Sequence, residues 1–179
     1  MTRDVPSWDV RAGVGTLRGM AFVLAPRTHT PRPDGLRPSV DTALRADSVA
    51  WLSSVQTDGR PHVAPVWFHW DGERIVAFSK PNARKIGNLR ERPTAMLAVG
   101  TPGPSFDVEL IEAAAELPDR PASEVMPDGF GAKYRELLRR AGLSVHGFAE
   151  VYSQPIVLRP TRFLRYGGRG WERAGALGT

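Results

Sequence analysis

A cluster of polar and cationic side chains between residues 79 and 88 has the residue types needed to bind an anion. Its members are Ser79, Lys80, Arg84, Lys85 and Asn88. Apolar residues at helical spacing predict a short helix that begins near Asn82 and ends before Pro93. The unpaired N–H groups and positive dipole at such a helix start favour a phosphate or carboxylate. The alternative is a solvent-facing basic helix that covers one end of the fold.

Lysine usage points to the same segment. The chain contains only three lysines, Lys80, Lys85 and Lys133, and otherwise uses arginine as its cation. Two of the three lie within the cluster, and a lysine ammonium group is a compact point charge suited to phosphate. Chance clustering in so small a sample is the alternative.

The stretch from Pro61 to Trp70 predicts a strand, because turn sequences flank it on both sides. Alternate side chains of a strand point to opposite faces, so His62 and His69 point opposite ways and cannot share a metal ion. Pro65 removes a hydrogen-bond donor, which predicts an edge strand or a bulge. A flat ligand ring could lie against Pro65, Val66 and Trp67; the alternative is a barrel corner in which Trp67 is packed.

The familiar catalytic patterns are missing from the sequence. It has no G-x-S-x-G elbow, no phosphate-binding P-loop, no H-E-x-x-H motif and no cysteine nucleophile. We therefore name no catalytic side chain and expect no metal site.

Composition narrows the class of protein. With 179 residues the chain is long enough for one domain with a full core. It has no cysteine and no apolar run near the roughly 20 residues of a membrane span, so we expect a cytoplasmic protein without a membrane partner. The net charge of +5 comes without a long basic run or a basic patch interleaved with aromatic residues, so we expect no nucleic-acid partner.

The remaining pattern predicts one domain with two extensions. Residues 1–35 are rich in Pro, Gly and Arg and predict an irregular extension, and residues 167–179 predict a mobile Gly-rich tail. The domain between them, 36–166, holds about six antiparallel strands with short helices, which predicts a small β-barrel. The expected elements are a helix from Ser39 or Asp41 to about Ala46, strands over 94–99, 106–117 and 154–166, a loop over 117–131, a helix over 132–141 and one capped by Ser144. A change of phase at Leu110–Ile111 predicts a bulge in the strand over 106–117.

Three stretches together resemble a known superfamily. They are WLSSVQTDGRPHVAPVWFHWDG, FSKPNARKIGNLRERP and YRELLRRAGL…FAEVYSQPIVLRPTRF. They resemble the pyridoxamine-phosphate-oxidase-like, FMN-binding split β-barrel superfamily, and within it the actinobacterial branch of probable deazaflavin (coenzyme F420)-dependent enzymes. The resemblance covers about Val40 to Tyr166. The C-terminal arginine and histidine arrangement of true pyridoxamine phosphate oxidases is absent, so a vitamin B6 enzyme is not expected.

The resemblance implies a split β-barrel homodimer with cofactor sites at the subunit interface. It implies that the cofactor ring lies against Pro65, Val66 and Trp67, and that His62 makes a further contact. The phosphate end and, for F420, the start of the polyglutamate tail would meet the positions of Ser79, Lys80, Arg84, Lys85 and Asn88.

The function implied is an oxidoreductase that uses reduced F420 to transfer a hydride to an unsaturated small molecule. Two alternatives stay open. One is an FMN-binding oxidase or reductase of the same fold, and the other is a non-catalytic protein that binds a cofactor or a ligand such as haem or a lipid. The substrate is not identified by the sequence.

Overall fold

The computed structural model describes residues 14–17, 20–23, 38–100, 108–167 and 170–173, and side chains within 38–100 and 108–165. In chain order the elements are β1 (Val14–Leu17), β2 (Met20–Val23), α1 (Pro38–Ala46), β3 (Ala50–Val55), β4 (Pro61–Val66), β5 (Phe68–Trp70), β6 (Ile75–Ser79), α2 (Arg84–Glu91), β7 (Thr94–Val99), β8 (Val108–Glu116), α3 (Ala122–Val125), α4 (Gly129–Arg140), α5 (Val145–Val151), β9 (Gln154–Gly167) and β10 (Gly170–Arg173).

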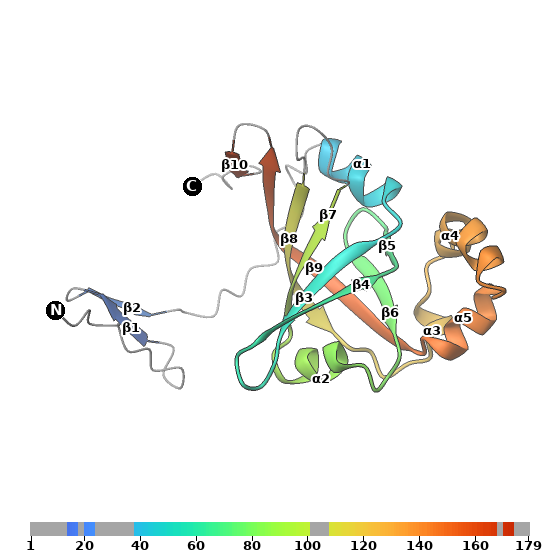
Figure 1. Cartoon of the computed structure of the whole chain (residues 1–179), viewed down its shortest axis with the longest axis horizontal. Coiled ribbons are helices and arrows are strands. Elements are labelled where there is room, and N and C mark those ends of the chain that lie inside the picture. Colours follow the sequence, from blue (N-terminus) through green and yellow to red (C-terminus); the bar gives the residue numbers. More distant parts are fainter. Residues whose placement is uncertain (1–13, 18–19, 24–37, 101–107, 168–169, 174–179) are drawn as a thin grey trace.

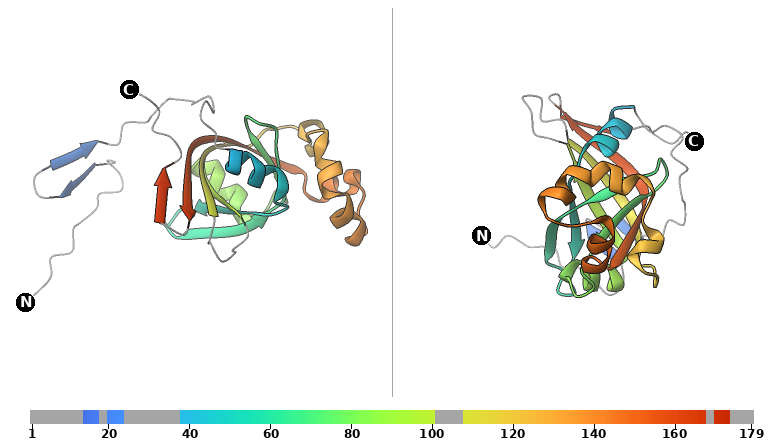
Figure 2. Two further views of the ribbon diagram at one scale, coloured as in Figure 1. Left: turned by 90° about the horizontal axis from the view of Figure 1, so that it is seen from above. Right: turned by 90° about the vertical axis from the view of Figure 1, so that its right-hand side faces the viewer.

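An antiparallel sheet of eight strands dominates the described chain. Its order is β4-β3-β7-β8-β9-β6-β5, and β10 pairs with β9. The sheet curls into a barrel, with α1 at one end, α2 at the other, and α3 to α5 along the side beside β5 and β6 (Figures 1 and 2). This architecture confirms the expected split β-barrel with short helices.

The sheet has eight strands where about six were expected, because one predicted strand is two and β10 adds another. The stretch Pro61–Trp70 pairs with β3 through β4 and with β6 through β5, and it changes partner at Trp67. A strand whose halves pair with opposite edges of a sheet must bend, and this bend closes the barrel. Pro65 lies on the edge strand β4, as its missing donor predicts.

The predicted bulge in β8 is wrong in position. Glu109, Ile111 and Ala113 are all buried, so the alternation of β8 is unbroken from Val108 to Ala113. The register shift instead falls opposite Glu112 and Ala113, where β9 has one residue more than β8. The extra residue is Thr161, directly after Pro160, which has no N–H group to donate to a ladder.

Two hydrophobic clusters stabilise the fold. One fills the barrel, with Leu52, Phe68, Trp70 and Ile111 among its members. The other lies between the outer face of β6 and helices α3 to α5 and includes Phe78, Phe130, Tyr134 and Phe148. All five residues of β6 are buried, because one face points into the barrel and the other is covered by helices.

Several element boundaries differ from the sequence expectations. The first helix begins at Pro38, and Asp41 lies in its first turn, where Oδ1 accepts a hydrogen bond from Trp70 Nε1 at 2.8 Å. Helix α2 begins at Arg84, without a side-chain cap. Helix α4 begins three residues earlier than expected, α3 lies within the predicted loop, and Ser144 caps α5 as expected by accepting from Gly147 N at 3.0 Å.

Both terminal extensions contain strands that the sequence did not predict. Residues 1–35 include β1 and β2, which pair with each other, and the tail includes β10, which pairs with β9. The rest of residues 1–35 and 174–179 lies outside the described residues. No helix of the described chain is long and apolar enough to cross a membrane.

Candidate functional site

A cleft of about 380 Å³ lies where β4 passes into β5. It is bounded by the end of β6, the turn into α2 and the α4–α5 helical hairpin. The lining residues are Val49, Pro65, Val66, Trp67, Phe78, Ser79, Lys80, Ala83, Lys85, Ala141, Leu143, Phe148 and Tyr152. Six of the nine residues proposed from the sequence are among them: Pro65, Val66, Trp67, Ser79, Lys80 and Lys85.

One end of the cleft is cationic. Lys85 donates from Nζ to Ser79 Oγ at 3.3 Å, and Lys80 lies at the exposed rim. Burial lowers the pKa of Lys85, because a charged ammonium group is less well solvated there. No acidic residue is among those that line the cleft, so within the described chain its positive charge is not balanced locally.

The start of α2 adds backbone donors to this end. Arg84 and Lys85 are the first two residues of the helix, and the preceding Ala83 offers no side-chain cap. Ile86 N donates to Ala83 O at 2.9 Å, so the N–H groups of Arg84 and Lys85 are the ones oriented to favour an anion.

The other end of the cleft is aromatic. The Trp67 ring stacks on Tyr134 with centroids 4.7 Å apart and an interplanar angle of 6°, and on Phe148 at 5.3 Å and 8°. Phe148 in turn stacks on Tyr152 at 4.7 Å. The two alternatives for Trp67 are thus compatible, since the ring is packed at a barrel corner and also lines the cleft.

Asn88 does not face the cleft, contrary to its predicted place beside Lys85. Its side chain is buried, and Nδ2 donates to the buried Ser54 Oγ at 2.9 Å. It shares the inner side of α2 with the buried Ile86 and Leu89. The polar amide predicts an exposed position, but in the fold it is paired with Ser54 on the inner side.

Arg84 and His62 lie beside the cleft and are not among its lining residues. Arg84 Nη1 donates to Gln56 Oε1 at 2.8 Å, which ties α2 to the hairpin between β3 and β4. His62 is half-buried, and its pKa is lowered first by burial and then by the charges of Lys85 and Arg84. It lies opposite Ser54 in the β3–β4 ladder, near the cationic end.

The sequence analysis missed the contribution of the α4–α5 hairpin. Ala141, Leu143, Phe148 and Tyr152 line the cleft. Phe148 is one of the two buried residues of α5. No local signal could show that this packing face meets Trp67, because the two lie some 80 positions apart in the chain.

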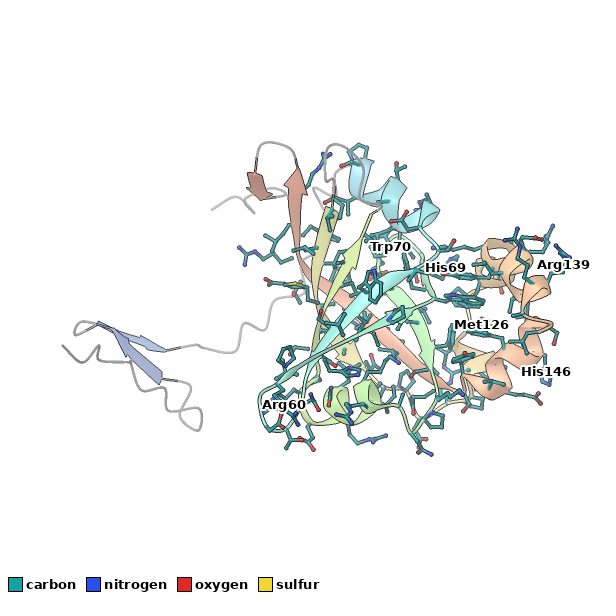
Figure 3. All side chains as sticks on the ribbon, in the orientation of Figure 1. Arg60, His69, Trp70, Met126, Arg139 and His146 are labelled. Atoms are coloured by element: carbon teal, nitrogen blue, oxygen red, sulfur yellow. The ribbon has the colours of Figure 1, made fainter. Side chains whose placement is uncertain are left out.

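His69, on the other face of the strand from His62, lies between the barrel and α4 (Figure 3). Burial and the nearby Lys133 lower its pKa. Within the described residues, no group of three or more His, Asp or Glu lies close enough to hold a metal ion.

The family of the chain follows from a comparison with family models. Residues 36–165 match the model described as Pyridoxamine 5'-phosphate oxidase. The chain belongs to this family. The expected superfamily is therefore confirmed. Membership supports the general properties of this superfamily, which are a flavin-type cofactor and oxidoreductase-like chemistry.

Solved structures of the same fold include proteins with different functions. One, named F420 Reductase, is 26% identical, with a TM-score of 0.51 over 69% of this chain and 94% of that one. A putative pyridoxamine 5'-phosphate oxidase from Listeria innocua is 20% identical, with a TM-score of 0.50 over 70% and 93%. HutZ, described as a haem storage protein from Vibrio cholerae, is 17% identical, with a TM-score of 0.54 over 75% and 97%. No curated protein matches the sequence.

Proposed function

We propose that this family member is an oxidoreductase that uses reduced coenzyme F420 to transfer a hydride to an unsaturated small molecule. The observation that supports it most directly is Lys85, a partly buried cation in a cleft whose lining holds no carboxylate. The similarity to a protein named F420 Reductase agrees with this assignment.

The residues of the cleft fit a phosphorylated deazaflavin. Lys80, Lys85, the Ser79 hydroxyl and the first N–H groups of α2 are donors suited to a phosphate. The flat aromatic and apolar surface beside Trp67 suits a planar ring. When bound, the deazaflavin supplies the hydride; the residues of the chain bind it, orient it and exclude water.

A cationic surface beyond the cleft favours F420 over FMN. Arg92 donates to the carbonyl oxygens of Gln56 and, at 3.2 Å, Thr57. Both acceptors are neutral, so they do not cancel the positive charge of the guanidinium group. Arg84 reaches the same β3–β4 hairpin, near Gln56 and Asp58, so two cations, of α2 and its C-cap, lie on the side of the helix that faces it. F420 carries a polyglutamate tail that such a surface would bind, whereas FMN ends at its phosphate.

FMN is the second candidate cofactor for the same cleft. The family model that matches the chain is described by an oxidase, Pyridoxamine 5'-phosphate oxidase, and a ribityl phosphate is common to both ligands. An FMN-dependent oxidase or reductase would use the same phosphate donors and leave the cationic surface along α2 without a ligand.

We further propose that the protein is a homodimer, joined by the outer face of β3, β7, β8 and β9. Trp51 of β3 is 54% exposed on this side of the sheet, and Val55 and Val63 of the β3–β4 ladder are exposed as well. In the register, Trp51 lies opposite Pro65 on one side and Ala98 on the other, and Ala98 lies opposite Leu110. An exposed apolar band of this kind is typical of a protein interface. Pro65 also lines the cleft, so the partner subunit would cover one of its edges.

The proposed function is tested by titrating the cofactor-free protein with F420 and, separately, with FMN, followed by the fluorescence of the ligand. Tight binding of F420 alone supports the first proposal and leads to assays of F420H2 oxidation with unsaturated acceptors. Preference for FMN supports the second candidate. Binding without turnover of the reduced cofactor by any acceptor indicates a storage protein, and binding of neither ligand contradicts both proposals.

A further inference from the structure

The hydroxyl of Tyr134 holds the backbone at the bend of the barrel. It accepts a hydrogen bond from Phe68 N at 2.8 Å, and the carbonyl oxygens of Phe68, at 2.8 Å, and Ser48, at 2.9 Å, lie within reach of its proton. The Tyr134 side chain is fully buried. One side chain of α4 thus joins the residues just before β3 to the first residue of β5.

The contacts with Phe68 lie directly after Trp67, the residue at which the strand changes partner. β4 ends at Val66 and β5 begins at Phe68, so Trp67 belongs to neither ladder. A backbone between two ladders lacks the regular hydrogen bonds that fix its direction. Tyr134 supplies partners for both polar groups of the Phe68 backbone and so fixes the chain directly after Trp67.

The ring of Tyr134 also contacts the side chain of Trp67. The two rings are nearly parallel, at 6°, with centroids 4.7 Å apart. Trp67 lines the cleft, whereas Tyr134 does not. The same residue therefore holds the backbone beside Trp67 with its hydroxyl and sets the plane of the indole with its ring.

We propose that Tyr134 is a positioning residue for the cofactor, acting through Trp67, which its hydroxyl and ring hold in place at the cleft. The inference rests on the proposed function, since it assumes that a flavin or deazaflavin ring lies against Trp67. It assigns a role in binding to a residue that does not itself line the cleft.

The neighbouring Lys133 provides a matched control. Its Nζ donates to Leu44 O at 3.1 Å and lies 4.0 Å from the centroid of the Phe68 ring. It thus stabilises the same junction of α1, α4 and β5, on the same helix. Among the described contacts it makes none with the Trp67 ring.

The first experiment measures binding of FMN and of F420 to the wild type, Tyr134→Phe, Trp67→Phe and the double variant. Tyr134→Phe should weaken binding of the wild type's preferred cofactor roughly 3- to 10-fold, the range set by one lost hydrogen bond. It should also change the visible circular dichroism of the bound cofactor, which reports how its ring is oriented. Lys133→Ala should lower thermal stability and leave both readouts unchanged.

The double variant tests whether Tyr134 acts through Trp67. If it does, the two substitutions are not additive, and Tyr134→Phe has little further effect once Trp67 is replaced. Additive effects, or an equal loss of affinity in Lys133→Ala, would overturn the proposal.

A measurement on the wild type covers the case in which Tyr134→Phe does not fold. The chain has three tyrosines, so protein labelled with 3-fluorotyrosine gives three ¹⁹F signals, assigned with Tyr152→Phe and Tyr166→Phe. The Tyr134 signal should shift on saturation with the cofactor. A constant Tyr134 signal while the cofactor binds would contradict the proposal.

Amide exchange in the cofactor-free protein separates this inference from the proposed function. Loss of protection at Phe68 in Tyr134→Phe, but not in Lys133→Ala, supports the role of the hydroxyl even if the wild type binds neither FMN nor F420. Unchanged protection in Tyr134→Phe, or equal loss in both variants, overturns it. If the wild type binds neither FMN nor F420, the proposed function is wrong, and the role of the Tyr134 hydroxyl is decided by the amide exchange alone.

Discussion

Within the described residues, Lys85 donates to one side chain, the neutral Ser79 Oγ, at one end of a cleft without a lining carboxylate. Lys85→Ala should therefore weaken cofactor binding roughly 10- to 100-fold, the range for a charge-assisted hydrogen bond. Arg90→Ala removes an exposed cation from the same helix and is the control. Similar small effects of both substitutions in the titration would show that the phosphate does not bind at Lys85.

Asn88 was predicted as a cofactor ligand, and its buried contact with Ser54 gives it a different task. Asn88→Ala leaves the Ser54 hydroxyl buried without this donor, so the free energy of unfolding should fall by about 1–3 kcal/mol. Urea unfolding measures this loss. The affinity of the folded variant for the cofactor should stay close to that of the wild type; a large loss of affinity without a loss of stability would restore Asn88 as a ligand.

Lys133 makes stability depend on pH, because burial lowers its pKa from 10.5 to about 8. Between these values the unfolded chain binds the proton more tightly than the folded protein, so stability should rise as the pH increases from 8 to about 10.5. Lys133→Met lacks this contribution. The wild type should therefore gain about 1–2 kcal/mol relative to Lys133→Met over this range, after allowance for solvent screening. Parallel pH profiles in urea unfolding would contradict the assigned pKa.

At the scale of elements, the packing of α4 on β5 depends on Gly129. A Cβ atom at this position would lie 2.5 Å from His69 Cε1, closer than real contacts allow. Gly129→Ala should lower the free energy of unfolding by about 1–3 kcal/mol, because the half-buried His69 ring must leave its position between the barrel and α4. The double variant Gly129→Ala/His69→Ala should recover part of the loss, measured by urea unfolding. Additive losses would show that the two residues do not collide.

Helices α4 and α5 therefore have two roles in this family member. They cover the outer face of β6 with an aromatic cluster, and they complete the wall of the cleft opposite the cationic start of α2. The shape of the cleft therefore depends on how α2 and the α4–α5 hairpin are placed relative to the bend between β4 and β5. Changes at their contacts, such as Gly129→Ala, should thus affect binding as well as stability.

At the scale of the whole molecule, the exposed apolar band around Trp51 predicts a dimer. Trp51→Glu should yield monomers, because a carboxylate buried in an interface is costly to desolvate. Light scattering after gel filtration measures the mass. Since Trp51 is exposed on the single chain, the monomer should keep its fold by circular dichroism. An unchanged dimer, or a wild type that is already monomeric, would contradict the proposed interface.

Much of this architecture was determined locally, by residues that act over a few positions. The turns at Gly59 and Gly72, both with positive φ, the cap at Ser144 and the alternation along each strand depend on neighbouring residues alone. That is why the sequence predicted the strands, the helices of the barrel and the group Pro65, Val66, Trp67, Ser79, Lys80 and Lys85. The cationic character of the segment after β6 also follows from local composition.

Tertiary structure decided the features that depend on distant partners. The strand Pro61–Trp70 divides at Trp67 because its halves pair with opposite edges of one sheet, and no local pattern encodes that choice. Asn88 turns inward because Ser54, on another strand, satisfies its amide. The cleft has its aromatic wall only because Tyr134 and Phe148 pack on Trp67 from far along the chain. The polarity and spacing of side chains indicate whether a residue tends to be buried or exposed. Its neighbours in the folded chain determine which surface it actually contacts.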